Sequence, residues 1–222
     1  MAKAAVVMDN NQKNGGLLES STALKNFKLE RFVRDLQIDS ISVESIDLLI
    51  HLGSDLTLVN GLTTDFMRTE AKVMTAAIQR GLPVFGICFG AQLMSLVLGG
   101  QVTRMPIPEI GWTSVSSSGD FSGFDGEWFQ WHYDTFSLPP GAVRLAENST
   151  CLQSFRKGRC LATQFHPELD MLTLNNWLNG GGDDELMALG ISPSKIVVET
   201  ESQLGGARAR FDEVLTWYLS TN

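Results

Sequence analysis

The sequence has 222 residues, of which 43% are hydrophobic, so the chain is long enough for one domain with a buried core. Its formal net charge of −8 argues against nucleic-acid binding, because phosphate recognition needs clustered Lys and Arg and the sequence has no such cluster. No apolar run approaches the roughly 20 residues that cross a bilayer, and the first residues lack the apolar core of a signal peptide. We therefore expect a single domain over 1–222, located in the cytoplasm, with neither nucleic-acid nor membrane partners.

The first hundred residues alternate between short apolar runs and segments with helical spacing. The apolar runs, which suit strands buried on both faces, are 4–8, 46–53 and 82–87. The segments with helical spacing are 20–36, with Leu24, Phe27, Phe32 and Leu36 in its apolar stripe, and 66–80. Asp65 is expected to cap the second helix and Gly81 to end it. This alternation predicts a parallel sheet covered by helices on both faces.

The second half has a different pattern, with short strands joined by turns. The predicted strands are 112–118, 127–133, 142–147, 151–157 and 159–165. Helices are expected to return after residue 168, the last of them near 207–219, and the glycines at 180–182 are expected to form a mobile connection. Together the two halves predict an α/β fold with an open, mostly parallel sheet and added antiparallel strands.

The three cysteines indicate neither a disulfide nor a metal site. Lys157 and Gly158 suit a hairpin turn that would place Cys160 opposite Phe155, away from Cys151. None of the cysteines has the C-x-x-C spacing of zinc sites or redox motifs. We therefore expect no disulfide, no metal and no cofactor, as is usual in a reducing compartment.

Cys88 lies in the motif Gly86-Ile87-Cys88-Phe89-Gly90, directly after a predicted buried strand. The pattern G-x-C-x-G is the cysteine counterpart of the turn that presents the nucleophile of many serine hydrolases. Such a turn is crowded, so its neighbours must be small, and a helix that begins at Phe89 directs the positive end of its dipole toward the sulfur. The motif predicts a nucleophile at the carboxyl edge of the sheet; the alternative is a thiol packed in the core.

A thiol nucleophile needs a base, and the sequence has three histidines. His51 lies within an apolar strand and is expected to be structural, whereas His132 lies among aromatic residues and is a candidate for lining a pocket. His166 precedes Pro167 and Glu168, and proline keeps the residue before it extended. Residues two apart in an extended segment point to the same side, so Glu168 can orient the His166 imidazole as in a catalytic triad.

A tetrahedral intermediate also needs N–H donors near the nucleophile, because its oxygen becomes negatively charged. The residue after the nucleophile, Phe89, is expected to supply one donor. The second must come from another loop at the same edge of the sheet. The end of the strand IDLLIHLGSD offers Gly53 or Ser54 for that purpose.

These motifs occur in an order that resembles the class I glutamine amidotransferase family. The matching segments are LGSD at 52–55, GICFGAQ at 86–92, LGG at 98–100, EIGW at 109–112, WHYD at 131–134 and QFHPE at 164–168. EIGW and WHYD are similar in particular to stand-alone members that resemble the amidotransferase domain of GMP synthase. The resemblance implies a flavodoxin-like fold of three layers, and it implies that EIGW supports the site without reacting.

The resemblance also implies how individual residues act on a γ-glutamyl amide. Cys88 would be the nucleophile that forms a γ-glutamyl thioester, His166 the general base and then acid, and Glu168 the residue that orients it. Gly53 and Phe89 would donate to the oxyanion. The α-amino and α-carboxylate groups of the substrate would be held by Ser54, Gln92, Trp131, His132, Tyr133 and Asp134.

Three functions fit this sequence. The first is a free-standing hydrolase of γ-glutamyl amides or peptides, indicated by the lack of a synthetase domain within 222 residues and by Tyr133, which stands where related domains usually have glycine and would reshape the pocket. The second is a glutaminase subunit that supplies ammonia to a separate synthetase. The third is a non-catalytic regulatory homologue, although such proteins usually lose Cys, His or Glu. We expect the first, with a small γ-glutamyl compound as substrate.

Overall fold

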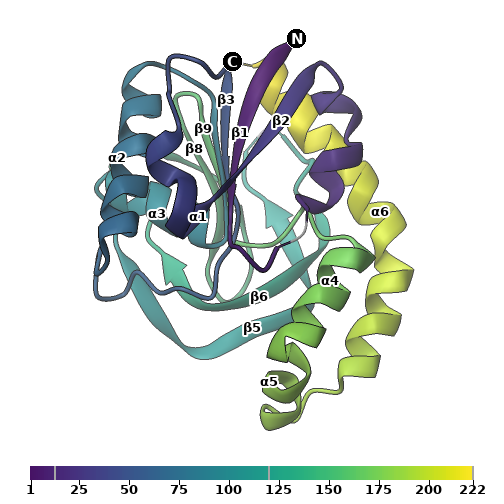
Figure 1. Ribbon diagram of the computed structural model, residues 1–222. Helices are drawn as coiled ribbons and strands as arrows, with labels where there is room; N and C mark the ends of the chain where they lie inside the picture. The colour runs from purple at the N-terminus through teal and green to yellow at the C-terminus, as the bar shows by residue number, and fades with distance from the viewer. Residues whose placement is uncertain (13, 120, 222) are drawn as a thin grey trace.

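Figure 1 shows the computed structural model, which describes residues 1–12, 14–119 and 121–221. The described residues form a nine-stranded sheet in the order β2-β1-β3-β4-β9-β8-β7-β5-β6. Its strands are β1 (Ala2–Met8), β2 (Phe27–Val33), β3 (Leu48–His51), β4 (Val84–Ile87), β5 (Val102–Ser117), β6 (Gly126–Phe136), β7 (Val143–Glu147), β8 (Leu152–Lys157) and β9 (Cys160–Thr163). The α-helices are α1 (Arg34–Gln37), α2 (Asp65–Gln79), α3 (Phe89–Val97), α4 (Met171–Trp177), α5 (Asp183–Ala188) and α6 (Pro193–Ser220).

The sheet is parallel on one side of β9 and antiparallel on the other. Strands β2, β1, β3, β4 and β9 pair in parallel, so their carboxyl ends meet at one edge. Strands β8, β7, β5 and β6 continue the sheet from β9 with antiparallel pairing. All residues of β3 and β4 are buried, as expected for parallel strands that are covered on both faces.

Helices cover both faces of the sheet (Figure 1). On one face, α6 and two short 3₁₀ turns, η1 (Gly16–Ser20) and η2 (Thr22–Leu24), pack on the parallel strands, with Phe211 and Tyr218 against Phe85. On the other face, α2 and α3 pack on the alternate residues of the same strands, including Val7 and Leu49. The predicted α/β fold, with an open sheet between two helical layers and antiparallel strands in the second half, is confirmed.

The helix predicted over 20–36 is wrong. Residues 27–33 of this segment form the edge strand β2, which is followed by the single turn of α1. The apolar residues of 27–33 fit the alternation of a strand as well as the spacing of a helical stripe. The segment forms a strand because it pairs in parallel with the whole length of β1. Leu36, which was expected on the buried stripe, is exposed.

Two helix boundaries also differ from the prediction. Thr64, and not Asp65, caps α2, since the Thr64 side chain accepts a hydrogen bond from a backbone N–H of the first turn. The last helix is much longer than 207–219, because α6 already begins at Pro193 after its cap Ser192. None of the described helices is both long and apolar enough to cross a membrane.

The hairpin between β8 and β9 has a different register from the predicted one. Its turn consists of Gly158 and Arg159, so Cys160 pairs with Lys157 and does not lie opposite Phe155. Gly158 has a φ of 57°, which glycine adopts without strain. The expectation that the cysteines remain unpaired still holds, because all three are free.

Candidate active site

The turn between β4 and α3 holds Cys88 in a strained backbone conformation. With φ at 50° and ψ at −107°, it is the single non-glycine residue of positive φ in the described part of the chain. Gly86 and Gly90 are required for steric reasons. A Cβ atom at Gly86 would lie 2.6 Å from the Gly90 carbonyl oxygen, and one at Gly90 would overlap the carbonyl of His51. The crowded turn that the motif predicts is therefore present, at the carboxyl edge of the parallel strands.

His166 and Glu168 lie beside Cys88 at this edge, directly after β9. The Nδ1 atom of His166 is 2.8 Å from Oε1 of Glu168, and both side chains are buried. A hydrogen bond donated by Nδ1 leaves the other ring nitrogen to face the thiol of Cys88, with which the ring is also hydrogen-bonded. The structure thus brings the three residues of the predicted triad together, while their catalytic roles stay a prediction.

The charge of His166 depends on its two neighbours. Burial by itself lowers the pKa of a histidine, because the protonated ring loses its hydration. Here the Glu168 carboxylate and the Cys88 side chain outweigh burial and raise the pKa of His166 to about 10. The ring therefore carries a proton at neutral pH.

Gly53 and Phe89, the predicted oxyanion donors, flank Cys88. A Cβ atom at Gly53 would lie 2.7 Å from Cε1 of His166 and 3.5 Å from Cβ of Cys88, so the loop after β3 leaves no room for a side chain. Phe89 is the first residue of α3, and the first N–H groups of a helix have no partner within it. Ser54, the alternative donor, follows Gly53 and faces the cavities at Cys88.

The loop that carries Gly53 is held by Arg34, a residue that no sequence motif indicates. Its side chain is 1% exposed, and its Nη2 donates to the carbonyl oxygens of Leu52 at 3.1 Å and Gly53 at 3.2 Å. The Leu52 carbonyl belongs to the same planar peptide unit as the N–H of Gly53, so this hydrogen bond fixes the direction of that N–H. The guanidinium also lies over the Phe89 ring, 4.5 Å from its centroid. Arg34 therefore contacts both segments that carry the predicted oxyanion donors.

Two carboxylates keep Arg34 charged in this buried position. Its Nε atom is 2.7 Å from Oδ1 of Asp9, and its Nη1 donates to Glu70. Burial lowers the pKa of Arg34, but Glu70 and Asp9 more than compensate and raise that pKa above its ordinary value. Oε1 of Glu70 is also 2.8 Å from Nδ1 of His51, so His51 belongs to a buried polar network beneath the site, as a structural histidine would.

Two cavities meet at Cys88. The larger cavity, of about 470 Å³, extends along β5 and β6, and the smaller cavity, of about 240 Å³, extends toward α4 and α5. Both are lined by Ser54, Asp55, Cys88, Trp131 and Glu185. His166 lines the smaller cavity, whereas Gln92 lines the larger. The glycines at 180–182, which were predicted to form a mobile connection, lie in the π-helical segment η4 (Leu178–Gly182) on the wall of the smaller cavity.

The predicted substrate-binding residues gather around the larger cavity. They are Ser54, Gln92, Trp131, His132, Tyr133 and Asp134. Arg104 of β5 adds a positive charge to this wall, with its Nε atom 3.2 Å from Oδ1 of Asp134. The side-chain amide of Gln92 donates to the Asp134 carbonyl at 3.1 Å and so ties α3 to β6. The larger cavity therefore offers both signs of charge, which suits the two charged groups of an α-amino acid.

The family model described as Glutamine amidotransferase class-I matches residues 14–177, which include the Cys88 turn and the His166-Glu168 segment. The chain belongs to this family. Among curated relatives, the glutamine-hydrolyzing GMP synthase of Aeropyrum pernix is 29% identical over 200 residues, which cover 82% of this chain and 39% of that protein. The GMP synthase of Thermus thermophilus is 31% identical over 149 residues, 61% of this chain and 30% of that protein. The chain thus spans less than half the length of these relatives.

Solved structures of glutamine amidotransferases have the same fold. A glutamine amidotransferase from Thermotoga maritima is 25% identical, with a TM-score of 0.89 over 98% of this chain and 97% of that chain. A glutamine amidotransferase from Methylobacillus flagellatus has a TM-score of 0.81 over 99% of this chain and 94% of that chain at 20% identity. The near-complete coverage in both directions shows that the helices after residue 177 belong to the fold of these proteins as well.

Glu185, in α5, is a further site residue of this class I glutamine amidotransferase that no motif indicates. Its Oε1 atom accepts hydrogen bonds from the Tyr133 hydroxyl at 2.7 Å and from the Trp131 indole N–H at 3.0 Å. Burial, followed by the hydrogen bond and charge of Glu185, raises the pKa of Tyr133 to about 12, so the hydroxyl remains a donor. Helix α5 thereby fixes the Tyr133 side chain at the edge of the larger cavity.

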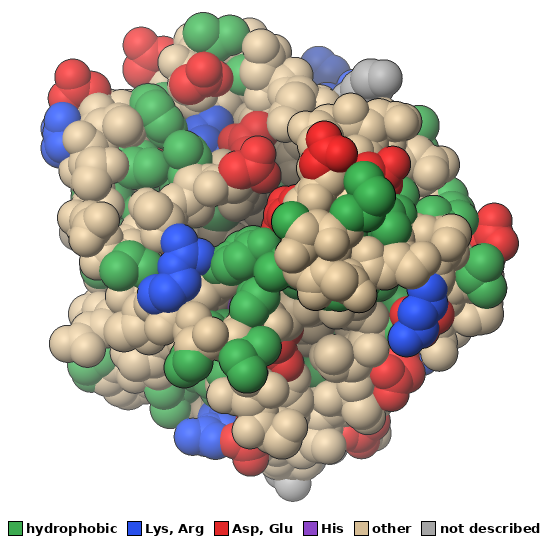
Figure 2. Space-filling model, turned by 90° about the horizontal axis from the view of Figure 1, so that it is seen from below, with side chains coloured by type: hydrophobic (Ala, Val, Ile, Leu, Met, Phe, Trp, Pro, Cys, Tyr) green, Lys and Arg blue, Asp and Glu red, His purple; other side chains and the backbone are tan. Residues whose placement is uncertain are grey.

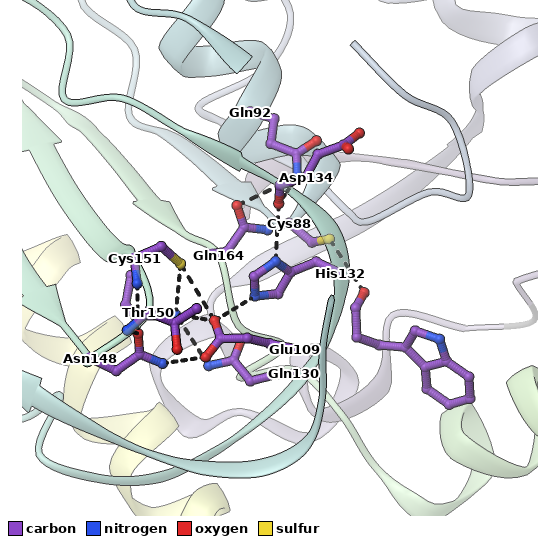
Figure 3. Close-up of polar contacts among 12 residues, drawn as sticks. Cys88, Gln92, Glu109, Gln130, His132, Asp134, Asn148, Thr150, Cys151 and Gln164 are labelled. Carbon is purple, nitrogen blue, oxygen red and sulfur yellow. Dashed lines mark hydrogen bonds and ion pairs between the residues drawn. The ribbon is translucent and has the colours of Figure 1, made fainter. Parts of the chain in front are cut away.

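Glu109, the first residue of EIGW, lies behind the larger cavity in a buried polar network (Figure 3). Oε2 of Glu109 is 3.1 Å from Nε2 of His132, whose Nδ1 is 3.0 Å from the Asp134 carbonyl oxygen. Glu109 also accepts hydrogen bonds from Asn148 at 2.6 Å and Gln153 at 2.8 Å. Burial raises the pKa of Glu109, but His132 and the other donors lower it overall to about 2. The charged carboxylate therefore orients His132 on β6.

Cys151 ends this network. Its Sγ atom donates to Oε2 of Glu109 at 3.4 Å and accepts from Nε2 of Gln153 at 3.2 Å. Burial, together with the charge of Glu109, raises the pKa of Cys151 to about 12, so the thiol stays protonated. Glu109, His132 and Cys151 present metal-ligand atoms within 4.8 Å of one another. Because hydrogen bonds already connect these atoms and Gln153 donates among them, we assign the cluster a structural role.

Proposed function

We propose that this amidotransferase cleaves γ-glutamyl amides through a covalent thioester on Cys88. The observation that supports it most is the contact of Cys88 with His166, whose Nδ1 is held by Glu168 at 2.8 Å. The thiolate attacks the γ-carbonyl carbon, and the resulting oxyanion accepts hydrogen bonds from the N–H groups of Gly53 and Phe89. His166 then gives its proton to the leaving nitrogen, and the C–N bond breaks.

Water completes the cycle. The neutral His166 takes a proton from a water molecule while the water oxygen attacks the thioester carbon. The second tetrahedral intermediate collapses and expels the Cys88 sulfur as a thiolate beside His166, which now carries the proton taken from water. Glutamate leaves as the second product, after its new carboxyl group ionises.

The larger cavity suits the amino-acid end of the substrate. Arg104 provides a partner for the α-carboxylate, and Asp134 provides one for the α-ammonium group. Gln92 and the aromatic residues of β6 form the walls between these charges and Cys88. A γ-glutamyl chain bound in this way directs its carbonyl carbon to the point where the two cavities meet.

The smaller cavity favours a leaving amine that is larger than ammonia. Cys88 and His166 both open into its space of about 240 Å³. Glutamine would place only an amide nitrogen on that side, whereas a substituent on the nitrogen would occupy the cavity. We therefore propose a free-standing γ-glutamyl amide or peptide hydrolase.

The relatives favour a second candidate, a glutaminase subunit that supplies ammonia to a separate synthetase. The curated relatives are named glutamine-hydrolyzing GMP synthases, and this chain corresponds to less than half of their length. In this second function a synthetase partner would receive ammonia released at His166.

Incubation of the purified chain with glutamine and with γ-glutamyl conjugates of primary amines separates the two candidates. We expect faster glutamate release from the conjugates, and a γ-glutamyl group on Cys88 in the mass spectrum of the protein during turnover. Release from glutamine alone, accelerated by an added synthetase, would favour the glutaminase subunit. If none of these compounds led to glutamate release or to an adduct on Cys88, both candidates would be rejected.

Gly53→Ala is expected to lower kcat/KM by about 10²-fold, because a displacement of roughly 1 Å at reacting groups costs that much in rate. The added methyl group would lie 2.7 Å from the His166 ring, so the ring or the loop must move. Gly205→Ala in α6 is the matched control, since no atom lies within 4 Å of the added methyl group. Steady-state kinetics and thermal unfolding should be measured for both variants. Equal activity of the two would contradict the proposed position of the oxyanion donor.

A further inference from the structure

The smaller cavity is lined by carboxylates, which the release of ammonia from glutamine does not require. Asp9, Asp55 and Glu185 line it, and none of its lining residues in the described part of the chain is Lys or Arg. Figure 2 views the molecule from the side where the parallel strands end and shows acidic side chains gathered around a hollow. The position of Cys88 and His166 in the same cavity makes this charge relevant to the reaction.

The three carboxylates differ in their partners. Asp9 forms an ion pair with Arg34, whose Nε is 2.7 Å from Oδ1 of Asp9 and which also pairs with Glu70. Asp55 and Glu185 have no Arg or Lys partner among the residues that the structure describes, and both hydrogen bonds to Glu185 reach Oε1, which leaves Oε2 for a ligand. Asp55 is exposed, and partial desolvation, followed by the charges of Asp9 and Glu185, raises its pKa. The like charges of these groups repel one another. A bound cation would relieve that repulsion.

Aromatic walls complete the surroundings of these carboxylates. The rings of Trp131 and Trp177 meet edge to face, with centroids 6.0 Å apart and an interplanar angle of 86°. The Trp177 ring also packs against His166 at 4.8 Å. The faces of indole rings attract organic cations, and nearby carboxylates strengthen this attraction through their negative charge. The cavity therefore has the side chains that proteins use to bind an alkylammonium group.

The proton donor shows which side of the substrate enters this cavity. His166 lines the smaller cavity and is absent from the lining of the larger, whereas Arg104 lines only the larger. The leaving nitrogen must face His166 to receive its proton. Arg104 instead suits the α-carboxylate at the other end of the substrate. The amine product consequently departs through the smaller cavity and passes Asp55 and Glu185, which lie where the two cavities meet.

We propose that the substrates are γ-glutamyl conjugates of aliphatic diamines or polyamines, whose second amino group is protonated and lies between Asp55 and Glu185. This inference rests on the proposed hydrolase function and specifies its substrate class. Attack by Cys88 breaks the amide C–N bond, the proton of His166 goes to the released nitrogen, and water then frees glutamate. The products are glutamate and the diamine.

Three conjugates of equal length test this proposal. Their γ-glutamyl group is joined to an alkyl chain that ends in an ammonium, a methyl or a carboxylate group. We expect kcat/KM to fall in that order, by about tenfold or more at each step, because one lost charge contact is equivalent to roughly a factor of ten. The free diamine should also inhibit cleavage of the methyl-ended conjugate.

Asp55→Asn is expected to lower the ratio of kcat/KM for the ammonium-ended over the methyl-ended conjugate by about tenfold. Asp39→Asn provides a matched control that removes one exposed aspartate outside both cavities, and it should leave the ratio unchanged. Both variants keep the shape of the side chain, so the ratio reports charge and not folding.

The possible outcomes separate this inference from the proposed function. Cleavage of the methyl-ended or carboxylate-ended conjugate at a rate equal to or above that of the ammonium-ended one would overturn the inference and leave the hydrolase intact. An unchanged ratio in Asp55→Asn would overturn it as well. Failure to cleave any conjugate, with wild-type protein that is folded by circular dichroism, would reject the hydrolase and the inference together.

Discussion

Replacing Cys88 with alanine is expected to lower glutamate release by at least about 10⁴-fold, because the loss of a covalent nucleophile has effects of this size. No thioester forms without the thiol, and Cys151 and Cys160 line neither cavity. Alanine and cysteine tolerate the positive φ of residue 88 equally, so the fold should persist. Glutamate assays, intact-protein mass spectra and thermal unfolding check these points.

Cys160→Ala is the control for Cys88→Ala. Cys160 is also buried, lies in β9 next to β4, and belongs to the core on the α2 and α3 side of the sheet. Its loss should cost a little stability and no activity. If Cys88→Ala retained the activity of Cys160→Ala, the thioester mechanism would be wrong. A wild-type chain as inactive as Cys88→Ala on every substrate would instead favour the non-catalytic homologue.

Glu168→Gln is expected to lower kcat/KM by about 10²- to 10⁴-fold at neutral pH, the range found when the residue that orients a catalytic histidine is neutralised. Glutamine keeps the size of the side chain but removes the charge 2.8 Å from Nδ1 of His166. Without the Glu168 charge, less remains to offset the effect of burial, which disfavours the protonated ring, and the pKa of His166 falls. The ring loses its proton at a lower pH and with it the ability to protonate the leaving amine.

The pH dependence tests this explanation directly. In the wild type the pKa of His166 is raised to about 10, so kcat/KM should decline only as the pH rises toward that value. Because the pKa of His166 is higher in the folded than in the unfolded state, the protonated ring stabilises the fold. This stabilisation is complete at pH values below the unfolded pKa of about 6.5, and it is lost as the pH rises through the pKa of the folded state. Glu168→Gln should therefore shift the alkaline limb of the rate profile to lower pH and flatten the alkaline loss of stability.

A glutamate on the surface controls for the loss of one negative charge. Glu201→Gln, on the exposed side of α6, should leave both pH profiles where they are in the wild type. An alkaline limb in Glu168→Gln that coincides with that of Glu201→Gln would show that Glu168 does not set the charge of His166.

The turn at Cys88 and the pairing of His166 with Glu168 were predictable because each follows from local geometry. The glycines beside Cys88 are forced by contacts within the turn, such as the 2.6 Å approach at Gly86. Proline between His166 and Glu168 sets an extended backbone that brings the two side chains together. The sequence alone does not bring Cys88 close to His166. The parallel pairing of β4 with β9 does so, because Cys88 follows β4 and His166 follows β9.

Other features were not predictable because no local pattern determines them. The apolar residues of 27–33 fit a strand and a helix alike, and pairing with β1 decides. Arg34 and Glu185 lie in no motif. Arg34 reaches the Gly53 loop from the first position of α1, directly after β2, and Glu185 reaches Tyr133 from α5. Their roles arise from contacts between segments that are far apart in the sequence.

Arg34 links the position of the proposed oxyanion donors to the outermost strand of the described sheet, because Arg34 directly follows β2. Among the described strands, β2 pairs only with β1, and weakly held segments open locally in native-state fluctuations more readily than the core. We expect an opening of β2 to break the hydrogen bonds of Arg34 to the Leu52 and Gly53 carbonyls while the Cys88 turn and the central strands remain folded. If the proposed oxyanion donors are held in this way, activity should be lost at lower denaturant concentration than the unfolding of the sheet.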